Sequence, residues 1–481
     1  MSNRKRFICL ILGPVIFALS ALLLRDLFTT SGAQAIGISL WMIFWWITRP
    51  VHITITALLP ALVNAFLNMV PMTDVISQYS CESIVLVFAS GLIIMPWASI
   101  GLDRRIALKV LSVVGPSMKS QTIVWLCATT IFSTVLPNIA VVTLFCPIAV
   151  AMLKAAGEED ISTSKAGLPI MLAIAWGVSL GGGGTPIGGA MNQTAIAALQ
   201  DFTGKEFMYS DWLIHVLPYT VIGTLGIYFG MRMLPMCREV KRLEGTKEFF
   251  KDSYAELGPM KGIEKFCLGA FVLSLVLAFT RTWYASLLPG LAPAYSMLTL
   301  GFICFFVVVK KDGQSSPLLT WEEAQHGMMW GMMLLFASGM AMGKLLNGTG
   351  ASEALGNIIS NMNLDGGLTT IIVLVVFTRL LSEVTNGTTA AAVACPIIFA
   401  FTSKLGLNPG PYWFICTFAY NAEFLLPISV RAVPVGYGLD AQKMLKGGIP
   451  MTILNMIIVI IFGYVCMKFI PGWGQLSYMF N

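Results

Sequence analysis

The sequence predicts an all-α polytopic membrane protein, built from two inverted repeats with about eleven transmembrane helices and two re-entrant hairpins. Of its 481 residues, 56% are hydrophobic and only 11% are charged, and the mean hydropathy is +0.79. Apolar runs of about 20 residues, the length that crosses a bilayer as a helix, begin at intervals from Phe7 to Met451. A water-soluble fold of this length could not bury so much apolar surface, so the composition indicates a membrane protein.

A duplication divides the chain into two halves. The Phe-Ala-Ser-Gly of residues 88–91 recurs at 336–339, and the Cys-Pro-Ile of residues 146–148 recurs at 395–397. The two pairs keep the same order and are 248 and 249 residues apart. If each half crosses the membrane an odd number of times, the second half is inserted upside down relative to the first, as in many membrane transporters.

Each half contains a polar break within an apolar run. The first break is Ser-Thr-Val-Leu-Pro-Asn at 133–138, and the second is Ser-Glu-Val-Thr-Asn-Gly-Thr-Thr at 382–389. Ten residues separate Pro137 from Pro147 and Asn386 from Pro396. Proline, asparagine and glycine unwind a helix, and such backbone is tolerated at membrane depth only inside protein or beside water. We interpret each break as the tip of a re-entrant hairpin.

A second break follows each hairpin, at 179–188 and at 427–436, and both segments are rich in glycine or proline. Together the four breaks would offer free backbone amides and helix N-termini, whose partial positive charge suits an anion such as a carboxylate. The alternative is that these residues only kink helices and allow close packing.

At these breaks the chain resembles the divalent anion/sodium symporter (DASS) family, the di- and tricarboxylate transporters. That family carries a Ser-Asn-Thr triplet at each tip. Here Pro137-Asn138-Ile139 occupies the first triplet, and Asn386-Gly387-Thr388 occupies the second when the halves are aligned on Cys-Pro-Ile. Alignment on asparagine would instead place Thr385-Asn386-Gly387 there.

The family's second signature, a Gly-Gly, Thr-Pro, Gly and Pro-Pro-Asn run, is partly retained. Gly182 to Gly188 and Asn192 match in the first half, whereas Val430 to Val433 replaces Thr-Pro-Pro-Asn in the second. The resemblance implies these substrate-binding residues: Asn138, Thr185, Pro186, Asn386, Gly387, Thr388, Pro427 and Ser429. Arg431 departs from the family's motif, and we expect it to bind the substrate anion because its guanidinium can hydrogen-bond a carboxylate. It also implies remnants of cation sites at Pro137, Gly184, Asn192 and Thr385.

The resemblance further implies a homodimer that moves di- or tricarboxylates, such as succinate, malate, 2-oxoglutarate, tartrate or citrate, by an elevator-type mechanism. Sodium is doubtful, because Pro137 and Ile139 lack the hydroxyls of the family triplet and Arg431 is a fixed cation beside the second cage. An arginine that stays uncompensated in the empty carrier would slow its return, so we expect sodium-independent exchange. The alternative function is a sodium- or proton-coupled symporter. The alternative for Arg431 itself is a structural role, at a helix end or the membrane interface, or paired with Glu423 or Asp440.

Other classes are disfavoured. The sequence has no His-Glu-x-x-His motif or nucleophile elbow, so we expect no enzyme, and its three separated histidines and ten scattered cysteines predict neither a metal site nor a cofactor. The charged connector within residues 212–265 contains both basic and acidic residues, so we do not expect the protein to bind nucleic acid. A channel stays open as an alternative, since re-entrant hairpins also build ion filters. The basic Arg4 to Arg6 predicts a cytoplasmic N-terminus in the plasma (inner) membrane, surrounded by lipid.

The repeats predict six regions. The first half comprises scaffold helices (1–118), a transport region with the first hairpin and unwound helix (119–211), and a last helix with a charged cytoplasmic connector (212–265). The second half comprises scaffold helices (266–362), a transport region with the second hairpin and unwound helix (363–446), and a C-terminal helix (447–481).

Overall fold

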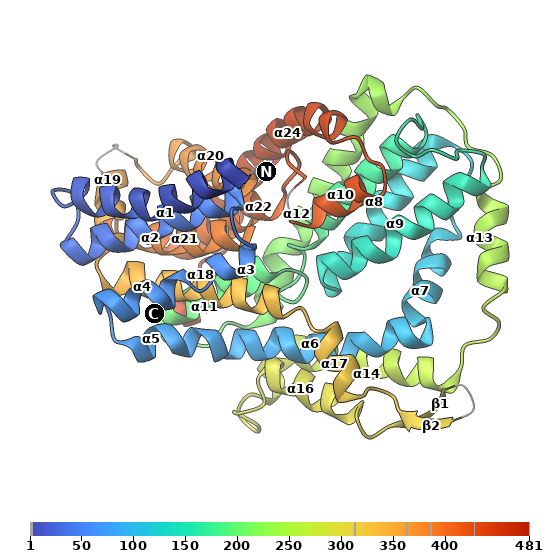
Figure 1. Ribbon diagram of the computed structural model, residues 1–481, viewed down its shortest axis with the longest axis horizontal. Coiled ribbons are helices and arrows are strands. Elements are labelled where there is room, and N and C mark those ends of the chain that lie inside the picture. Colours follow the sequence, from blue (N-terminus) through green and yellow to red (C-terminus); the bar gives the residue numbers. More distant parts are fainter. Residues whose placement is uncertain (1–2, 312–313, 361–363, 385–386, 428, 481) are drawn as a thin grey trace.

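The computed structural model describes residues 3–311, 314–360, 364–384, 387–427 and 429–480, and these fold into helices apart from one two-stranded hairpin (Figure 1). The helices of the first half are α1 (Asn3–Leu23), α2 (Thr30–Thr48), α3 (Ile53–Thr56), α4 (Leu59–Leu67), α5 (Met72–Ile76), η1 (Ser77–Ser80), α6 (Glu82–Ile100), α7 (Leu102–Leu111), α8 (Met118–Val135), α9 (Asn138–Ala155), α10 (Gly167–Gly181), α11 (Ala190–Thr203), α12 (Tyr209–Met233), η2 (Pro235–Cys237) and α13 (Thr246–Ala255).

The second half begins with α14 (Gly262–Phe279), α15 (Arg281–Tyr284) and α16 (Pro293–Ile303). The antiparallel strands β1 (Val308–Lys311) and β2 (Gln314–Pro317) follow, with Val308 opposite Pro317. The remaining helices are α17 (Trp321–Gly327), α18 (Trp330–Gly348), α19 (Ala351–Ser360), α20 (Leu368–Val384), α21 (Gly387–Lys404), α22 (Pro409–Asn421), η3 (Ser429–Arg431), α23 (Ala432–Gly436), α24 (Ala441–Phe469) and α25 (Ser477–Phe480).

The predicted all-α polytopic membrane class is confirmed. Six helical stretches among the described residues are long and apolar enough to cross a bilayer: α1, residues 72–100, α9, α12, α14 and α24. The pair α17 and α18, bent by 58°, would make a seventh, and shorter apolar helices lie at residues 53–67, in α10 and in α16. The count of about eleven crossings stays a prediction.

The duplication extends to the helix boundaries. Helix α8 ends at residue 135 and α9 begins at 138, and 249 residues later α20 ends at 384 and α21 begins at 387. The first boundary follows from proline, which pushes the residue before it out of the helical region. Accordingly, Leu136 is extended, with φ −113° and ψ 148°, and Pro137 caps α9.

Two helices that lead into the second breaks form the centre of the protein. Every residue of α10 is buried, and so is every residue of α22, which is expected of helices that are apolar on all sides. Helix α10 packs on α8 and α9, while α22 packs on α20 and α21. Figure 1 shows α8 to α10 on one side and α20 to α22 on the other, with the long α24 running along the top and contacting both α12 and α20. The breaks are therefore held by the most buried parts of the fold.

Candidate functional site

A cavity of about 1470 Å³ is lined by both hairpin tips and both second breaks. The first tip contributes Pro137 and Asn138, and the second contributes Gly387 and Thr388. Ser179, Ile187 and Gly188 come from the break at 179–188, and Val430 and Arg431 come from the break at 427–436. Segments that are about 250 residues apart in the sequence thus surround one space, as the duplication suggests.

In the first half, side-chain hydrogen bonds join the tip to the following break. The Ser133 hydroxyl lies 2.6 Å from Asn138 Oδ1 and 3.0 Å from the carbonyl oxygen of Val178. Thr185 donates a hydrogen bond from its hydroxyl to the carbonyl of Thr134. Asn192 donates to the carbonyls of Gly182 and Thr185, at 2.7 Å each. These contacts fix the unwound backbone around Asn138.

The cavity wall, as far as described residues form it, takes in only part of the predicted site. Asn138, Gly387, Thr388, Arg431 and Pro137 line it. Four other candidates lie next to the wall and do not line it: Gly184, Thr185, Pro186 and Asn192. The carbonyl of Pro186 accepts a hydrogen bond from Gln193 at 2.6 Å. Pro427 is half-buried outside the wall, and Ser429 begins η3. Thr385 and Asn386 lie outside the described residues.

The tip at 133–138 packs closely against the break at 179–188, and Gly188→Ala tests this packing. An added Cβ would lie 2.5 Å from the carbonyl oxygen of Ser133 and 2.8 Å from that of Thr134. Backbone atoms cannot rotate aside, so we expect the variant to lose about 1–3 kcal/mol of stability, as overpacked sites do. Thermal unfolding in detergent measures the loss. Gly343→Ala is the control, since nothing lies within 4 Å of a Cβ there, and an equal loss in both variants would contradict the assignment.

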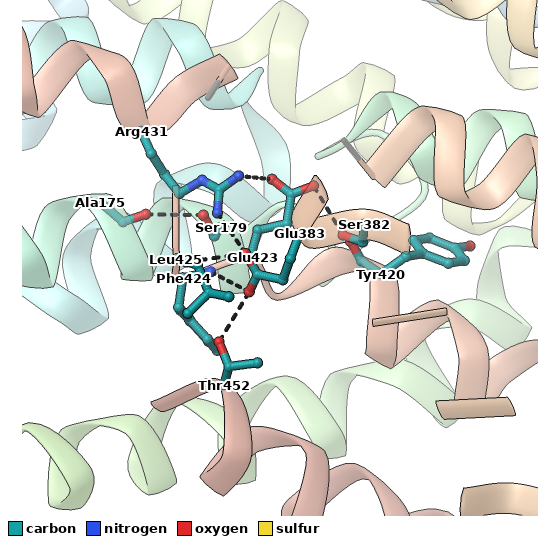
Figure 2. Close-up of polar contacts among 10 residues, drawn as sticks. All are labelled: Ala175, Ser179, Ser382, Glu383, Tyr420, Glu423, Phe424, Leu425, Arg431 and Thr452. Atoms are coloured by element: carbon teal, nitrogen blue, oxygen red, sulfur yellow. Dashed lines mark hydrogen bonds and ion pairs between the residues drawn. The ribbon is translucent and has the colours of Figure 1, made fainter. Parts of the chain in front are cut away.

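In the second half, Arg431 lies between two glutamates. Its Nη1 is 3.1 Å from Glu383 Oε2 and its Nη2 is 2.8 Å from Glu423 Oε2 (Figure 2). The Arg431 side chain is fully buried, the Glu383 side chain is 2% exposed and the Glu423 side chain is 10% exposed. Of the two partners that the sequence suggested for Arg431, the structure has Glu423; Asp440 instead caps α24.

Glu383 holds three elements together. Its carboxylate accepts hydrogen bonds from the backbone N–H groups of Phe424 (2.8 Å) and Leu425 (3.1 Å) and from the hydroxyl of Thr452 (3.1 Å). With Arg431 this makes four donors around one carboxylate (Figure 2). Both backbone partners of Glu383 lie in the segment that follows α22.

Arg379 adds a second buried guanidinium. It hydrogen-bonds Asn455 of α24, and its guanidinium carbon lies 5.6 Å from the ring centre of Phe424. Arg379 and Arg431 balance Glu383 and Glu423, so four buried ionisable side chains carry no net formal charge. Arg431 forms an ion pair with each glutamate, which is how buried charges are stabilised, whereas Arg379 forms no ion pair with a described residue.

The protein can be placed among known families through its sequence. A family model described as citrate transporter matches residues 43–419. The chain belongs to the citrate transporter family. This confirms the resemblance to the di- and tricarboxylate transporters of the divalent anion/sodium symporter family, and it makes the protein a membrane transporter and not an enzyme.

Two staphylococcal proteins are similar to this chain over nearly its whole length. Both are named sodium-dependent dicarboxylate transporter SdcS. The protein of Staphylococcus saprophyticus is 26% identical over 475 residues, which cover 96% of this chain and 91% of the relative. The protein of Staphylococcus aureus is 27% identical over 482 residues, which cover 97% and 92%.

Two solved structures share the fold. The YdaH transporter of Alcanivorax borkumensis matches with a TM-score of 0.55 and 11% identity, over 84% of this chain and 88% of its own. MtrF of Neisseria gonorrhoeae, from a class of antimetabolite efflux pumps, matches with a TM-score of 0.53 and 13% identity, over 84% of each chain. At these identities the likeness concerns the fold alone.

One expectation about this family member is wrong. We expected the positive charge of Arg431 to be uncompensated, and we gave this as the reason for exchange. In the structure Arg431 is paired with Glu383 and Glu423. The charge argument for exchange is therefore removed, while exchange itself stays a prediction. The site residues expected from the sequence did not include Ser90, Asn421 or Glu423, yet all three line the cavity.

Proposed function

We propose that the protein is a secondary transporter that takes up di- or tricarboxylates by cation-coupled symport. The observation that carries this proposal is a cavity bordered by both tips, at whose wall Arg431 lies in a cluster without net charge. A guanidinium is suited to a carboxylate because its N–H groups match the two oxygens. A neutral empty site can also return across the membrane without substrate, which net uptake requires. The names of the staphylococcal relatives support the same substrate class and the sodium coupling.

A coupling sodium ion, as a transported co-substrate, fits the first half better than the second. There the break around Gly182 and Thr185 supplies carbonyl oxygens, and Asn138 and Asn192 supply amides. In the second half Arg431 is a fixed cation close to where the resemblance places a second ion, and like charges repel strongly in a medium of low polarity. We therefore place the coupling ion near Asn138.

The movement we propose is of the elevator type, in a homodimer, with two re-entrant hairpins and two unwound helices travelling as one unit. Its support is the packing of α10 and α22, which are buried along their whole length and join the breaks to α8, α9, α20 and α21. We place this unit in residues 119–211 and 363–446, with the scaffold in the flanking regions and the N-terminus on the cytoplasmic side of the plasma membrane.

Sodium-independent exchange is the second candidate. The presence of Arg431 where the resemblance places a cation site favours it, because a fixed charge needs no coupling ion. The two candidates differ in what they require on each side of the membrane, so one flux assay distinguishes them.

The test is uptake of labelled succinate and citrate by proteoliposomes at fixed pH. We expect an inward sodium gradient to drive uptake into vesicles that hold no substrate. Choline in place of sodium removes the driving ion and should reduce uptake about tenfold or more, which corresponds to about 1.4 kcal/mol or more. A proton gradient in choline tests proton coupling. Uptake that needs internal carboxylate and ignores sodium would favour exchange, and protein-free liposomes give the background.

A further inference from the structure

We propose that Glu423 is an internal competitor of the substrate, which binds Arg431 when the site is empty and gives it up to a substrate carboxylate. This rests on the proposed function, because it takes a carboxylate as the transported anion. It assigns a role to a residue that sequence reasoning considered only as a possible partner of Arg431.

The two glutamates that hold Arg431 differ in how firmly they are bound. Glu383 has three donors besides Arg431, two of them backbone N–H groups, and it is 2% exposed. Glu423 has the Ser382 hydroxyl at 3.1 Å, the nearby Gly387 amide and Arg431. Both residues line the cavity, but the Glu423 side chain is 10% exposed, whereas the Arg431 side chain has no exposed surface. Of the two side chains, Glu423 is therefore the more accessible to a carboxylate in the cavity.

The two oxygens of Glu423 have separate partners. Oε1 accepts the hydrogen bond from Ser382, and Oε2 accepts the one from Arg431. The side chain can thus turn Oε2 away from Arg431 while Oε1 keeps Ser382. The backbone permits this, because Glu423 lies just after the end of α22 at residue 421, in a segment without helical structure. Turning would free one guanidinium N–H group, in addition to the Arg431 Nε, which has no partner among the described residues.

The repeat shows what Glu423 replaces. Ser133 and Ser382 are equivalent, 249 residues apart, and in the first half the Ser133 hydroxyl contacts the amide oxygen of Asn138. The residue equivalent to Asn138 is Gly387, which has no side chain, and the Ser382 hydroxyl contacts Glu423 instead. The serine hydroxyl thus contacts a carboxylate oxygen in the second half and a neutral amide oxygen in the first. The Glu423 carboxylate also lies within reach of Arg431, whose charge only a negative group can neutralise.

The charge balance gives Glu423 two measurable effects. When it is present, the cluster of Arg379, Glu383, Glu423 and Arg431 is neutral, and a substrate must compete with it for Arg431. When its charge is removed, the empty site carries one positive charge in a poorly polar region, which attracts an anion but opposes return of the empty carrier. A merely structural glutamate would have neither effect.

The experiment compares Glu423→Gln with wild type in binding and in two modes of flux. We expect the purified variant to bind succinate or citrate about tenfold more tightly by calorimetry, since one competing charged hydrogen bond is removed. In proteoliposomes we expect net uptake into substrate-free vesicles to fall about tenfold or more, while exchange with internal substrate stays within about threefold of wild type. Asp440→Asn is the matched control. It removes a carboxylate of the same region, and asparagine can still cap α24.

Weaker binding by Glu423→Gln, or an equal fall of net uptake and exchange, would overturn the proposal. If that variant does not fold, Glu423→Asp makes the same test, because it withdraws the carboxylate from Arg431 and should tighten binding by a smaller factor. If wild type binds neither succinate nor citrate, the proposed function fails as well. Wild-type binding that the Glu423 variants weaken would remove the competitor alone.

Discussion

Replacing Arg431 by glutamine is expected to reduce carboxylate uptake about 100-fold or more, since loss of one partner leaves buried charges unpaired. The variant keeps Glu383 and Glu423, of which Glu423 lines the cavity, and their negative charge then opposes the anion that has to bind. Glutamine can still donate hydrogen bonds, so the fall in uptake would come from the missing charge and the missing planar pair of N–H groups more than from the smaller side-chain volume.

Labelled succinate uptake by proteoliposomes measures this effect, and two companions define it. Arg431→Lys keeps the charge but not the planar fork, so we expect an intermediate rate. Arg242→Gln is the control, because Arg242 is an exposed residue paired with Glu244 in the connector. Wild-type rates in Arg431→Gln would show that the guanidinium does not serve the transported anion.

Adding Glu423→Gln to Arg431→Gln separates folding from transport. The double variant removes one positive and one negative charge, so the buried cluster is neutral again, and we expect most of the lost thermal stability to return. Uptake should stay low, because no guanidinium is left for the substrate. Recovery of uptake together with stability would mean that Arg431 acts only as the partner of its glutamates.

Much of this architecture could be predicted because it depends on local sequence. Helix α8 ends where a proline follows Leu136, and the equivalent boundary of α20 and α21 follows from the 249-residue repeat. The breaks rich in glycine and proline pointed to unwound backbone, and both tips do line one cavity. Proline and glycine act on their own neighbours, so a single sequence carries their effect.

The charge of the site could not be predicted in the same way, because its partners are distant in sequence. Glu383 meets Phe424 after 41 residues and Arg431 after 48. Considered alone, Arg431 is a positive charge in a membrane segment. One signal was available: of the five charged residues from 379 to 431, Lys404 follows the apolar run of the second hairpin, and the other four, Arg379, Glu383, Glu423 and Arg431, are two of each sign. Since intramembrane charges are rare and usually paired, this balance pointed to a neutral cluster.

Glu383→Ala should be the most destabilising single change around the second tip, by about 3–5 kcal/mol, which is the usual cost of breaking a buried ion pair. Alanine leaves the backbone N–H groups of Phe424 and Leu425 and the hydroxyl of Thr452 without this acceptor. The break after α22 then loses its attachment to α20 and α24. We expect a lower melting temperature in detergent and a loss of uptake that accompanies it.

The comparison that identifies the cause uses two further variants. Glu353→Ala removes an exposed glutamate from α19 and should leave melting and uptake close to wild type. Glu383→Gln keeps one oxygen acceptor and should lose less stability than alanine does. A Glu383→Ala protein that melts like wild type would show that the break is held by other contacts. Glu383 has four donors, whereas Glu423 has fewer and more exposed contacts, so we expect the Glu383 variant to lose more stability than the Glu423 variant. The Glu423 variant should instead change the ratio of net uptake to exchange. This difference would show that Glu383 holds the cluster in place and that Glu423 is the glutamate that a substrate can replace.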